Sequence, residues 1–145
     1  MRNTFVIALI ALIFISCKKD KFTTKPQLTF KSINTKVLDR RQIILFTLSY
    51  TDLEGDLQDS IYVEKIEPTC PLSGFNSKYL LPTFPSSRNS EGDIQVSFGY
   101  NVENYPLIKA PQCNRNDTCY FRFALKDKAQ NVSDTVKSDV FVIIK

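Results

Sequence analysis

The sequence predicts an all-β protein that folds as a single β-sandwich of about seven antiparallel strands. After Pro26 the apolar side chains recur with a period of two instead of the 3.6 of a helix. The 11 Phe and 6 Tyr residues favour strands, because aromatic side chains fit a pleated surface. Several short strands separated by turn-rich segments are typical of two packed sheets, and 145 residues are enough for one such domain.

The first half of the predicted domain contains three expected strands. The first opens at Leu28 and Phe30 and runs on toward Val37. The second covers residues 43–50 and is apolar on both faces, so we expect it in the middle of a sheet. The third covers residues 60–66.

The second half contains three more expected strands. Residues 93–102 alternate between apolar and polar side chains, which predicts one buried and one wet face. Residues 119–126 alternate in the same way. The last expected strand covers residues 135–144 and places three aliphatic side chains in one register: Val140, Val142 and Ile144.

Two long segments rich in Pro interrupt this pattern: residues 67–92 and residues 103–117. Loops of this length in a compact domain are either functional or loosely ordered, so we expect a ligand-contact surface there. Their aromatic residues suit a shallow patch that binds a glycan or a peptide, and the alternative is that they cover the ends of the sandwich. The candidate ligand-contact residues are Phe75, Tyr79, Phe84 and Tyr105.

The N-terminal segment 1–16 has the pattern of a signal peptide. Arg2 supplies the positive start, and an apolar run covers residues 5–15. This run is shorter than the roughly 20 residues that a membrane-spanning helix needs. Ser16 places a small side chain directly before Cys17.

The stretch Phe14-Ile15-Ser16-Cys17 resembles the lipobox of bacterial lipoproteins, and the following Lys18-Lys19-Asp20 is similar to the start of mature lipoproteins from Bacteroidota. The resemblance implies cleavage before Cys17, lipidation of its thiol and attachment to the cell envelope, at either face of the outer membrane. The alternatives are an ordinary secretory signal with an incidental cysteine, or an uncleaved anchor. Residues 17–26 are then a flexible tether rich in Lys and Thr, and residues 27–145 the sandwich domain.

A second resemblance lies near the C-terminus. Residues 125–134 resemble the late hairpin of bacterial immunoglobulin-like and fibronectin-III-like domains, which often carry a D-x-A-G-N turn. Here the turn reads Asp127-Lys128-Ala129-Gln130-Asn131, with Gln130 where Gly is usual. The resemblance implies that the sandwich is of the immunoglobulin-like type.

With Cys17 lipidated, three cysteines remain, and these allow one disulfide in an oxidising envelope. Cys70 and Cys113 both lie in the long loops, so we favour a bridge between them. Cys119 shares a strand face with apolar side chains, which suits a buried free thiol. A bridge between Cys113 and Cys119 is the alternative.

The turn between the second and third expected strands is acidic. Dense carboxylate oxygens suit Ca²⁺, although the spacing does not match an EF-hand loop. The alternative is a polar turn in which Gly55 has a positive φ. The candidate ligands are Asp52, Glu54, Asp56 and Asp59, and we expect no other cofactor.

The composition argues against catalysis and against nucleic-acid binding. The absence of His excludes Ser–His–Asp and Cys–His nucleophile systems, and a net charge of +4 is not the concentrated basic face that nucleic acid requires. We therefore expect a non-catalytic, lipid-anchored protein of the cell envelope that binds a protein or glycan partner. The alternative is a periplasmic structural or assembly accessory lipoprotein of the outer membrane.

Overall fold

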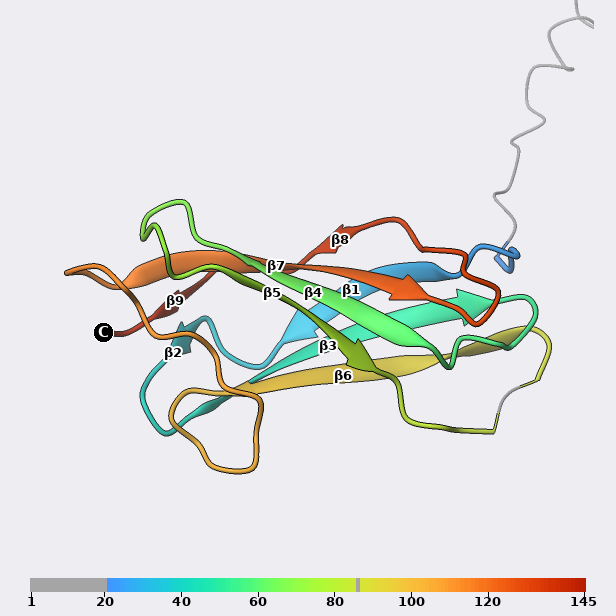
Figure 1. Ribbon diagram of the computed structural model, residues 1–145, viewed down its shortest axis with the longest axis horizontal. Coiled ribbons are helices and arrows are strands. Elements are labelled where there is room, and N and C mark those ends of the chain that lie inside the picture. Colours follow the sequence, from blue (N-terminus) through green and yellow to red (C-terminus); the bar gives the residue numbers. More distant parts are fainter. Residues whose placement is uncertain (1–20, 86) are drawn as a thin grey trace, which may run out of the picture.

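The computed structural model describes residues 21–85 and 87–145, and within them the protein is all-β (Figure 1). The predicted signal segment and Cys17 lie outside these residues. The described residues form nine strands in two sheets and contain no helix. No segment among them is therefore a candidate for a membrane-spanning helix.

The smaller sheet has three antiparallel strands in the order β1-β3-β6. The prediction that residues 43–50 lie in mid-sheet is confirmed, because this segment belongs to the central strand. Along that strand buried residues alternate with half-buried ones, since one face packs on the core. The strands are β1 (Gln27–Ile33), β3 (Ile43–Asp52) and β6 (Ser90–Gly99).

The larger sheet has six strands, and it differs from the prediction in one pairing. Its order is β2-β9-β7-β4-β5, with β8 also paired to β7. β2 and β9 are parallel, whereas the sequence predicted about seven strands that were all antiparallel. The strands are β2 (Val37–Leu38), β4 (Ser60–Ile66), β5 (Phe75–Leu80), β7 (Asp117–Lys126), β8 (Val136–Lys137) and β9 (Phe141–Ile143).

The first expected strand is divided between the sheets, and Asn34 marks the division. Its side-chain oxygen accepts a hydrogen bond from the backbone N–H of Leu45 (2.8 Å), and its amide nitrogen donates to the carbonyl of Ile43 (3.0 Å). The Asn34 N–H still donates to the Leu45 carbonyl (3.1 Å), and the side-chain bonds take the place of the return bond to the Asn34 carbonyl, which ends the pairing of β1 with β3. The chain then crosses to the other sheet and forms β2.

The last expected strand is divided as well, at Ser138. The Ser138 hydroxyl accepts a hydrogen bond from the N–H of Phe121 (2.9 Å), and the Ser138 N–H donates to the Phe121 carbonyl (2.9 Å). The buried residues of this segment are Phe141 and Ile143. The three aliphatic residues that the sequence placed in one register alternate with them and are exposed or half-buried: Val140, Val142 and Ile144.

Phenylalanine rings from both sheets form the centre of the core. The ring centroid of Phe46, from the smaller sheet, lies 4.7 Å from that of Phe121 and 5.3 Å from that of Phe123, both in β7. Phe98 of β6 reaches Phe121 at 5.3 Å. Tilted ring pairs at these distances stabilise a core beyond the area that they bury.

The described chain begins at one end of the sandwich and finishes at the other (Figure 1). Residues 21–26, which were predicted to belong to a flexible tether, contact the end of β3. The Thr51 hydroxyl donates to the Lys21 carbonyl (2.8 Å), the Leu53 N–H donates to the Thr23 carbonyl (3.3 Å), and Pro26 is buried. The folded domain thus begins before residue 27.

Candidate functional site

A cavity of about 460 Å³ lies between β5 and β6, which are edge strands of different sheets. Among the described residues, each of these strands pairs with a partner on one side only, so their facing edges meet through side chains. The volume lies within the range of about 300–1,000 Å³ that is typical of small-molecule pockets. This cavity is the candidate functional site.

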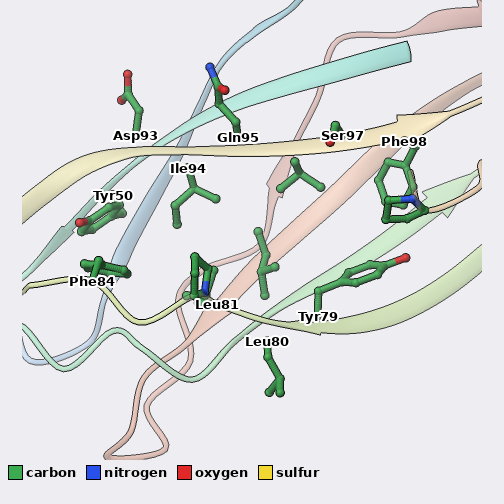
Figure 2. Close-up of a pocket in the computed structure, with 14 residues that line it drawn as sticks. Tyr50, Tyr79, Leu80, Leu81, Phe84, Asp93, Ile94, Gln95, Ser97 and Phe98 are labelled. Carbon is green, nitrogen blue, oxygen red and sulfur yellow. The ribbon is translucent and has the colours of Figure 1, made fainter. Parts of the chain in front are cut away.

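The walls of the cavity are apolar because both strands alternate. β6 turns every second side chain toward the cavity, and its polar residues Asp93, Gln95 and Ser97 point to the other side of the strand (Figure 2). The opposite wall comes from the end of β5 and the loop after it. The apolar residues that face each other across the cavity are Ile94, Val96 and Phe98 on one side and Tyr79, Leu81 and Phe84 on the other.

The loop between β5 and β6 folds over one end of the cavity. The Gln58 side-chain amide donates a hydrogen bond to the Phe84 carbonyl. The Phe84 ring lies 6.2 Å from the ring of Tyr50, measured between centroids. These contacts hold Phe84 against the sandwich, where it closes the cavity beside Tyr50 (Figure 2).

Of the four predicted ligand-contact residues, the structure brings together Tyr79 and Phe84. Phe75 belongs to the core, with its ring centroid 5.6 Å from that of Phe98. Tyr105 lies in the loop after β6, where its Cβ approaches Gly99, and it does not line the cavity. Phe75 and Tyr79 were expected in an irregular loop, and they lie instead in β5.

The sequence analysis missed the wall that β6 contributes. Ile94 and Val96 were assigned to the buried face of a strand, and both are in fact only half-buried. The strand alternation located this face correctly. The alternation in β6 could not show that a cavity would remain between this strand and β5.

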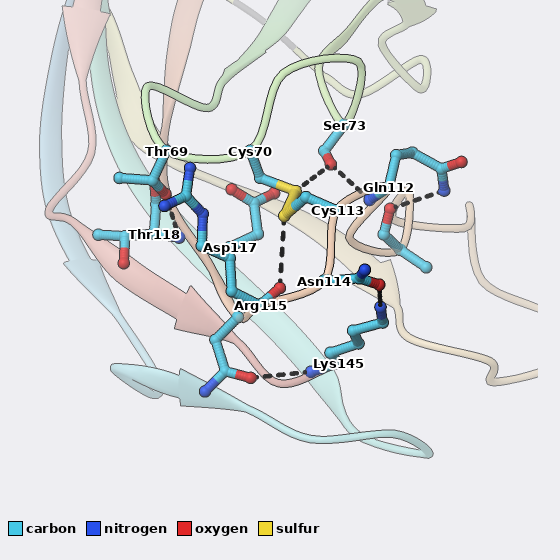
Figure 3. Close-up of a disulfide and its surroundings, with 12 residues drawn as sticks. Thr69, Cys70, Ser73, Gln112, Cys113, Asn114, Arg115, Asp117, Thr118 and Lys145 are labelled. Atoms are coloured by element: carbon cyan, nitrogen blue, oxygen red, sulfur yellow. Dashed lines mark hydrogen bonds between the residues drawn. A yellow bond between two sulfur atoms is a disulfide. The ribbon is translucent and has the colours of Figure 1, made fainter.

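The predicted disulfide between Cys70 and Cys113 is confirmed, with Cα atoms 5.6 Å apart (Figure 3). It joins the loop after β4 to the loop before β7, at the end of the sandwich opposite Lys21. The Ser73 hydroxyl donates to the Cys70 sulfur (3.0 Å) and accepts from the Gln112 N–H (2.8 Å). A bridge that closes a loop of 43 residues stabilises the fold by roughly 3–4 kcal/mol.

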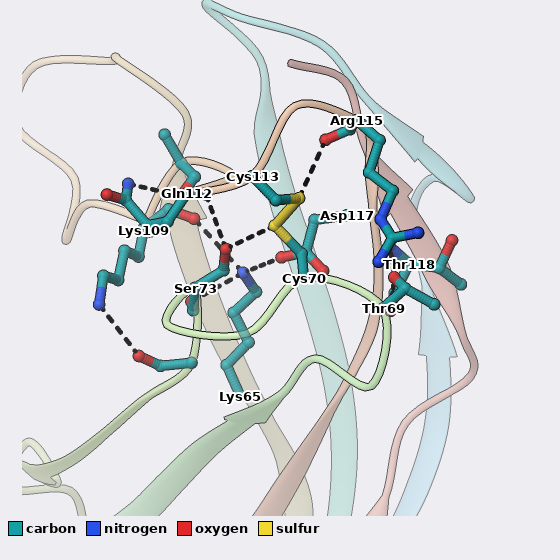
Figure 4. Close-up of polar contacts among 12 residues, drawn as sticks. Lys65, Thr69, Cys70, Ser73, Lys109, Gln112, Cys113, Arg115, Asp117 and Thr118 are labelled. Carbon is teal, nitrogen blue, oxygen red and sulfur yellow. Dashed lines mark hydrogen bonds and ion pairs between the residues drawn. A yellow bond between two sulfur atoms is a disulfide. The ribbon is translucent and has the colours of Figure 1, made fainter.

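A buried ion pair lies next to the disulfide (Figure 4). The side chains of Lys65 and Asp117 are both fully buried, and the Lys65 ammonium donates to Asp117 Oδ2. The ammonium also donates to the carbonyls of Ser73 (2.9 Å) and Lys109 (3.4 Å). These three bonds use all the donors of the ammonium group and join β4 to both long loops. The pair is structural, because water and ligands do not reach it.

Cys119 is a buried free thiol, as predicted. Its pKa is raised to about 12, chiefly by burial; the positive charge of Lys65 lowers it, and the negative charges of Asp117 and Glu67 raise it. A thiol must ionise to act as a nucleophile. Cys119 therefore stays protonated, and a poor nucleophile, near neutral pH.

The structure brings together two of the four predicted Ca²⁺ ligands. Asp52 and Asp56 lie in one cluster with Asp127, in which one carboxylate oxygen of each residue lies within 4.8 Å of the others. Glu54 is exposed and outside this cluster. Asp59 is also outside it, and its Oδ2 accepts from the Ser60 hydroxyl (3.0 Å).

Burial dominates the electrostatics of Asp52, which ends β3. It raises the pKa of the carboxyl above its usual value, and hydrogen bonds from the N–H groups of Gly55 (2.7 Å) and Asp56 (3.0 Å) oppose the rise. The turn is formed as predicted, with Gly55 at φ +74°. Asp127 was not selected from the sequence, although it begins the D-x-A-G-N-like turn, where Gln130 has φ +74°.

Comparisons with known proteins show no family. No family model and no curated protein matches the chain. Among solved structures it is similar to the sporulation control protein Spo0M from Bacillus subtilis (7% identity, TM-score 0.47), covering 85% of this chain and 51% of that one. It is similar to a β-glucosidase from Listeria innocua at 14% identity and a TM-score of 0.43, covering 83% of this chain and 16% of that one. It is also similar to a Niemann-Pick type C2 protein from the Japanese carpenter ant at 11% identity and a TM-score of 0.42, covering 88% of this chain and 96% of that one.

The chain thus spans about half the length of the sporulation control protein and a small part of the glucosidase. None of the three similarities is strong enough to carry an argument about ligand or activity.

Replacing the buried ammonium should destabilise the fold. We expect Lys65→Met to lower the free energy of unfolding by about 3–5 kcal/mol, because Asp117 remains buried without its partner. Urea denaturation measures the change. Lys109→Met, at an exposed lysine, is the control and should change stability by less than about 0.5 kcal/mol. The double variant Lys65→Met/Asp117→Leu should recover part of the loss, and a Lys65→Met protein as stable as the wild type would contradict this account.

Cys119 should resist alkylation while the domain is folded. We expect no reaction of the 21–145 segment with iodoacetamide at pH 8, because a pKa near 12 keeps the thiol protonated there. In denaturant the mass should rise by one alkyl group, since the other two cysteines of this segment form the disulfide. Intact mass spectrometry measures both states, and rapid modification of the folded segment would disprove the assignment.

Proposed function

We propose that the protein is a non-catalytic, lipid-anchored binding module of the cell envelope, most simply of the outer membrane. In this proposal an immunoglobulin-like sandwich holds a slender apolar ligand, such as a fatty acyl chain, in the cavity between β5 and β6. The observation that carries the proposal is the apolar lining of that cavity.

The cavity is costly for a structural protein to keep. Most of its apolar walls are only half-buried, so they stay in contact with water and do not give the stability that full burial would give. The core on the other side of Phe98 is closely packed by aromatic rings, so the cavity lies beside a packed centre and not within it. A ligand that fills the cavity would cover these walls, which supports a binding role.

The reactive groups that the chain contains support a non-catalytic role. The sequence has no His. Lys65 and Asp117 neutralise each other in the interior, and the Cys119 thiol is buried. The anchor is supported by the signal-like segment and by the small residue before Cys17.

Filling the cavity should weaken ligand binding. We expect Val96→Phe to reduce the affinity of the 21–145 segment for a dansyl-labelled fatty acid at least tenfold, about 1.4 kcal/mol, without lowering Tm. Fluorescence titration measures the affinity. Val140→Phe is a matched control, because Val140 is 53% exposed and lies outside the cavity, and it should bind like the wild type. Failure of the wild-type segment to bind, or equal affinity of Val96→Phe, would exclude the apolar-ligand proposal and favour the accessory role.

Removing the lipidated thiol should release the protein from the membrane. We expect the wild-type chain in the membrane fraction of its native host and Cys17→Ser in the soluble fraction, because acyl chains supply the anchoring energy. Fractionation followed by immunoblotting measures the distribution. Cys119→Ser removes a different thiol and should remain with the membrane. A Cys17→Ser protein that still fractionates with the membrane would indicate an uncleaved anchor.

A further inference from the structure

The acidic cluster at the end of the sandwich where the described chain begins has the features of a cation site. We propose that Asp52, Asp56 and Asp127 bind Ca²⁺ there. This inference is independent of the apolar cavity and of the function proposed above. It also corrects the ligand set that the sequence suggested, since Asp127 replaces Glu54 and Asp59.

The geometry and chemistry of the cluster fit Ca²⁺. One oxygen from each of the three carboxylates lies within 4.8 Å of the others. Bonds from Ca²⁺ to oxygen measure about 2.3–2.6 Å, so two oxygens on opposite sides of the ion are separated by up to about 5 Å. A donor set made only of oxygen atoms, with three formal negative charges, suits this hard cation better than a transition metal.

Two buried oxygen atoms give the independent reason to infer a ligand. Asp52 is fully buried and its Oδ1 has no hydrogen-bond partner among the described residues. Asp56 Oδ1 is likewise buried without a partner there. An ionised carboxylate in the interior needs a cation or a full set of hydrogen-bond donors. A bound cation would satisfy both oxygen atoms at once.

The comparison with Asp117, a buried aspartate outside the cluster, is informative. Its Oδ1 also has no hydrogen-bond partner among the described residues, but its Oδ2 is paired with the ammonium of Lys65. None of the salt bridges between described residues includes a member of the acidic cluster. The protein thus supplies its own cation at one end of the sandwich, and at the other end it places three carboxylates together without one.

The segments that carry the carboxylates are already held in place. The Lys128 N–H donates to the Asp56 carbonyl (3.0 Å), which joins the β3–β4 loop to the turn after β7. Asn131 donates to both oxygens of Asp127, from its backbone N–H (2.7 Å) and from its side chain (2.9 Å). Each of these oxygens keeps a second lone pair for a cation. Bound Ca²⁺ would therefore strengthen an existing junction between the loops.

Thermal unfolding of the full chain in a neutral detergent tests the site. After removal of metal with EDTA, we expect CaCl₂ to raise Tm by roughly 5–10 °C at about a hundred times Kd, followed by circular dichroism. Asp127→Asn should abolish most of the shift. Glu54→Gln removes a charge from the same loop outside the cluster, and its shift should equal that of the wild type.

Direct binding keeps the test decisive if Asp127→Asn fails to fold. Tb³⁺ luminescence sensitised by the tyrosines of the wild-type chain should appear and should be displaced by Ca²⁺, and Asp56→Asn should weaken it at least tenfold. No Tm shift and no luminescence from folded wild type would overturn the proposal. A shift lost in Glu54→Gln but retained in Asp127→Asn would overturn it too, because the ion would then lie on the β3–β4 loop alone.

Discussion

The contact between the two sheets is made by side chains, and the rest of the structure depends on how well they fill the space. Around Phe121 the filling is dense, with the rings of Phe46 and Phe98 at 4.7 and 5.3 Å. Toward the facing edges of β5 and β6 it is not, since the side chains there are half-buried and enclose about 460 Å³. The same architecture thus gives a closely packed centre and a cavity between two strand edges. The proposed binding role uses this cavity, and Phe98 belongs both to its wall and to the packed centre.

The two ends of the sandwich are stabilised by different physical means. The end with the C-terminus has a covalent bridge, a buried ion pair and a hydroxyl that contacts both: Cys70–Cys113, Lys65–Asp117 and Ser73. These hold the segment before β5 and the segment before β7, which have almost no strand pairing of their own. The opposite end is held by backbone hydrogen bonds between loops, and the three carboxylates of the acidic cluster oppose this by repelling one another. Its stability should respond to the ions in the surrounding solution far more than that of the bridged end.

The sequence predicted the parts of the fold that depend on local pattern. Strand 60–66 and the mid-sheet position of 43–50 follow from alternation and hydrophobicity. The bridge between Cys70 and Cys113 was favoured because both lie in long loops, while Cys119 lies on an apolar strand face. β5 was missed because Ser77 interrupts its inward face and prolines follow it. An edge strand buries little, so it needs few apolar residues.

The candidate sites were only partly predictable, because both depend on contacts between distant segments. Tyr79 and Phe84 were selected as aromatic loop residues, but their partners Ile94 and Val96 looked like ordinary core positions. Asp127 joins Asp52 and Asp56 only because β3 and β7 end on the same side of the sandwich. No spacing within one segment contains that information. The resemblance at 127–131 indicated a tight turn, and that turn is what orients the third carboxylate.

The parallel pairing of β2 with β9 has a consequence for the order in which the chain can fold. Val37 pairs with Val142, more than a hundred positions later. Contacts between such distant residues form slowly, because a long loop must close before they are made. Leu38 is fully buried in the folded domain and pairs with Ile143. In a chain that lacks its last few residues, Leu38 would be exposed to solvent. Under the proposed export to the cell envelope, the chain would therefore stay incompletely folded until residues 141–143 have crossed the membrane, which keeps it able to pass through a translocon and leaves it open to proteolysis in that interval.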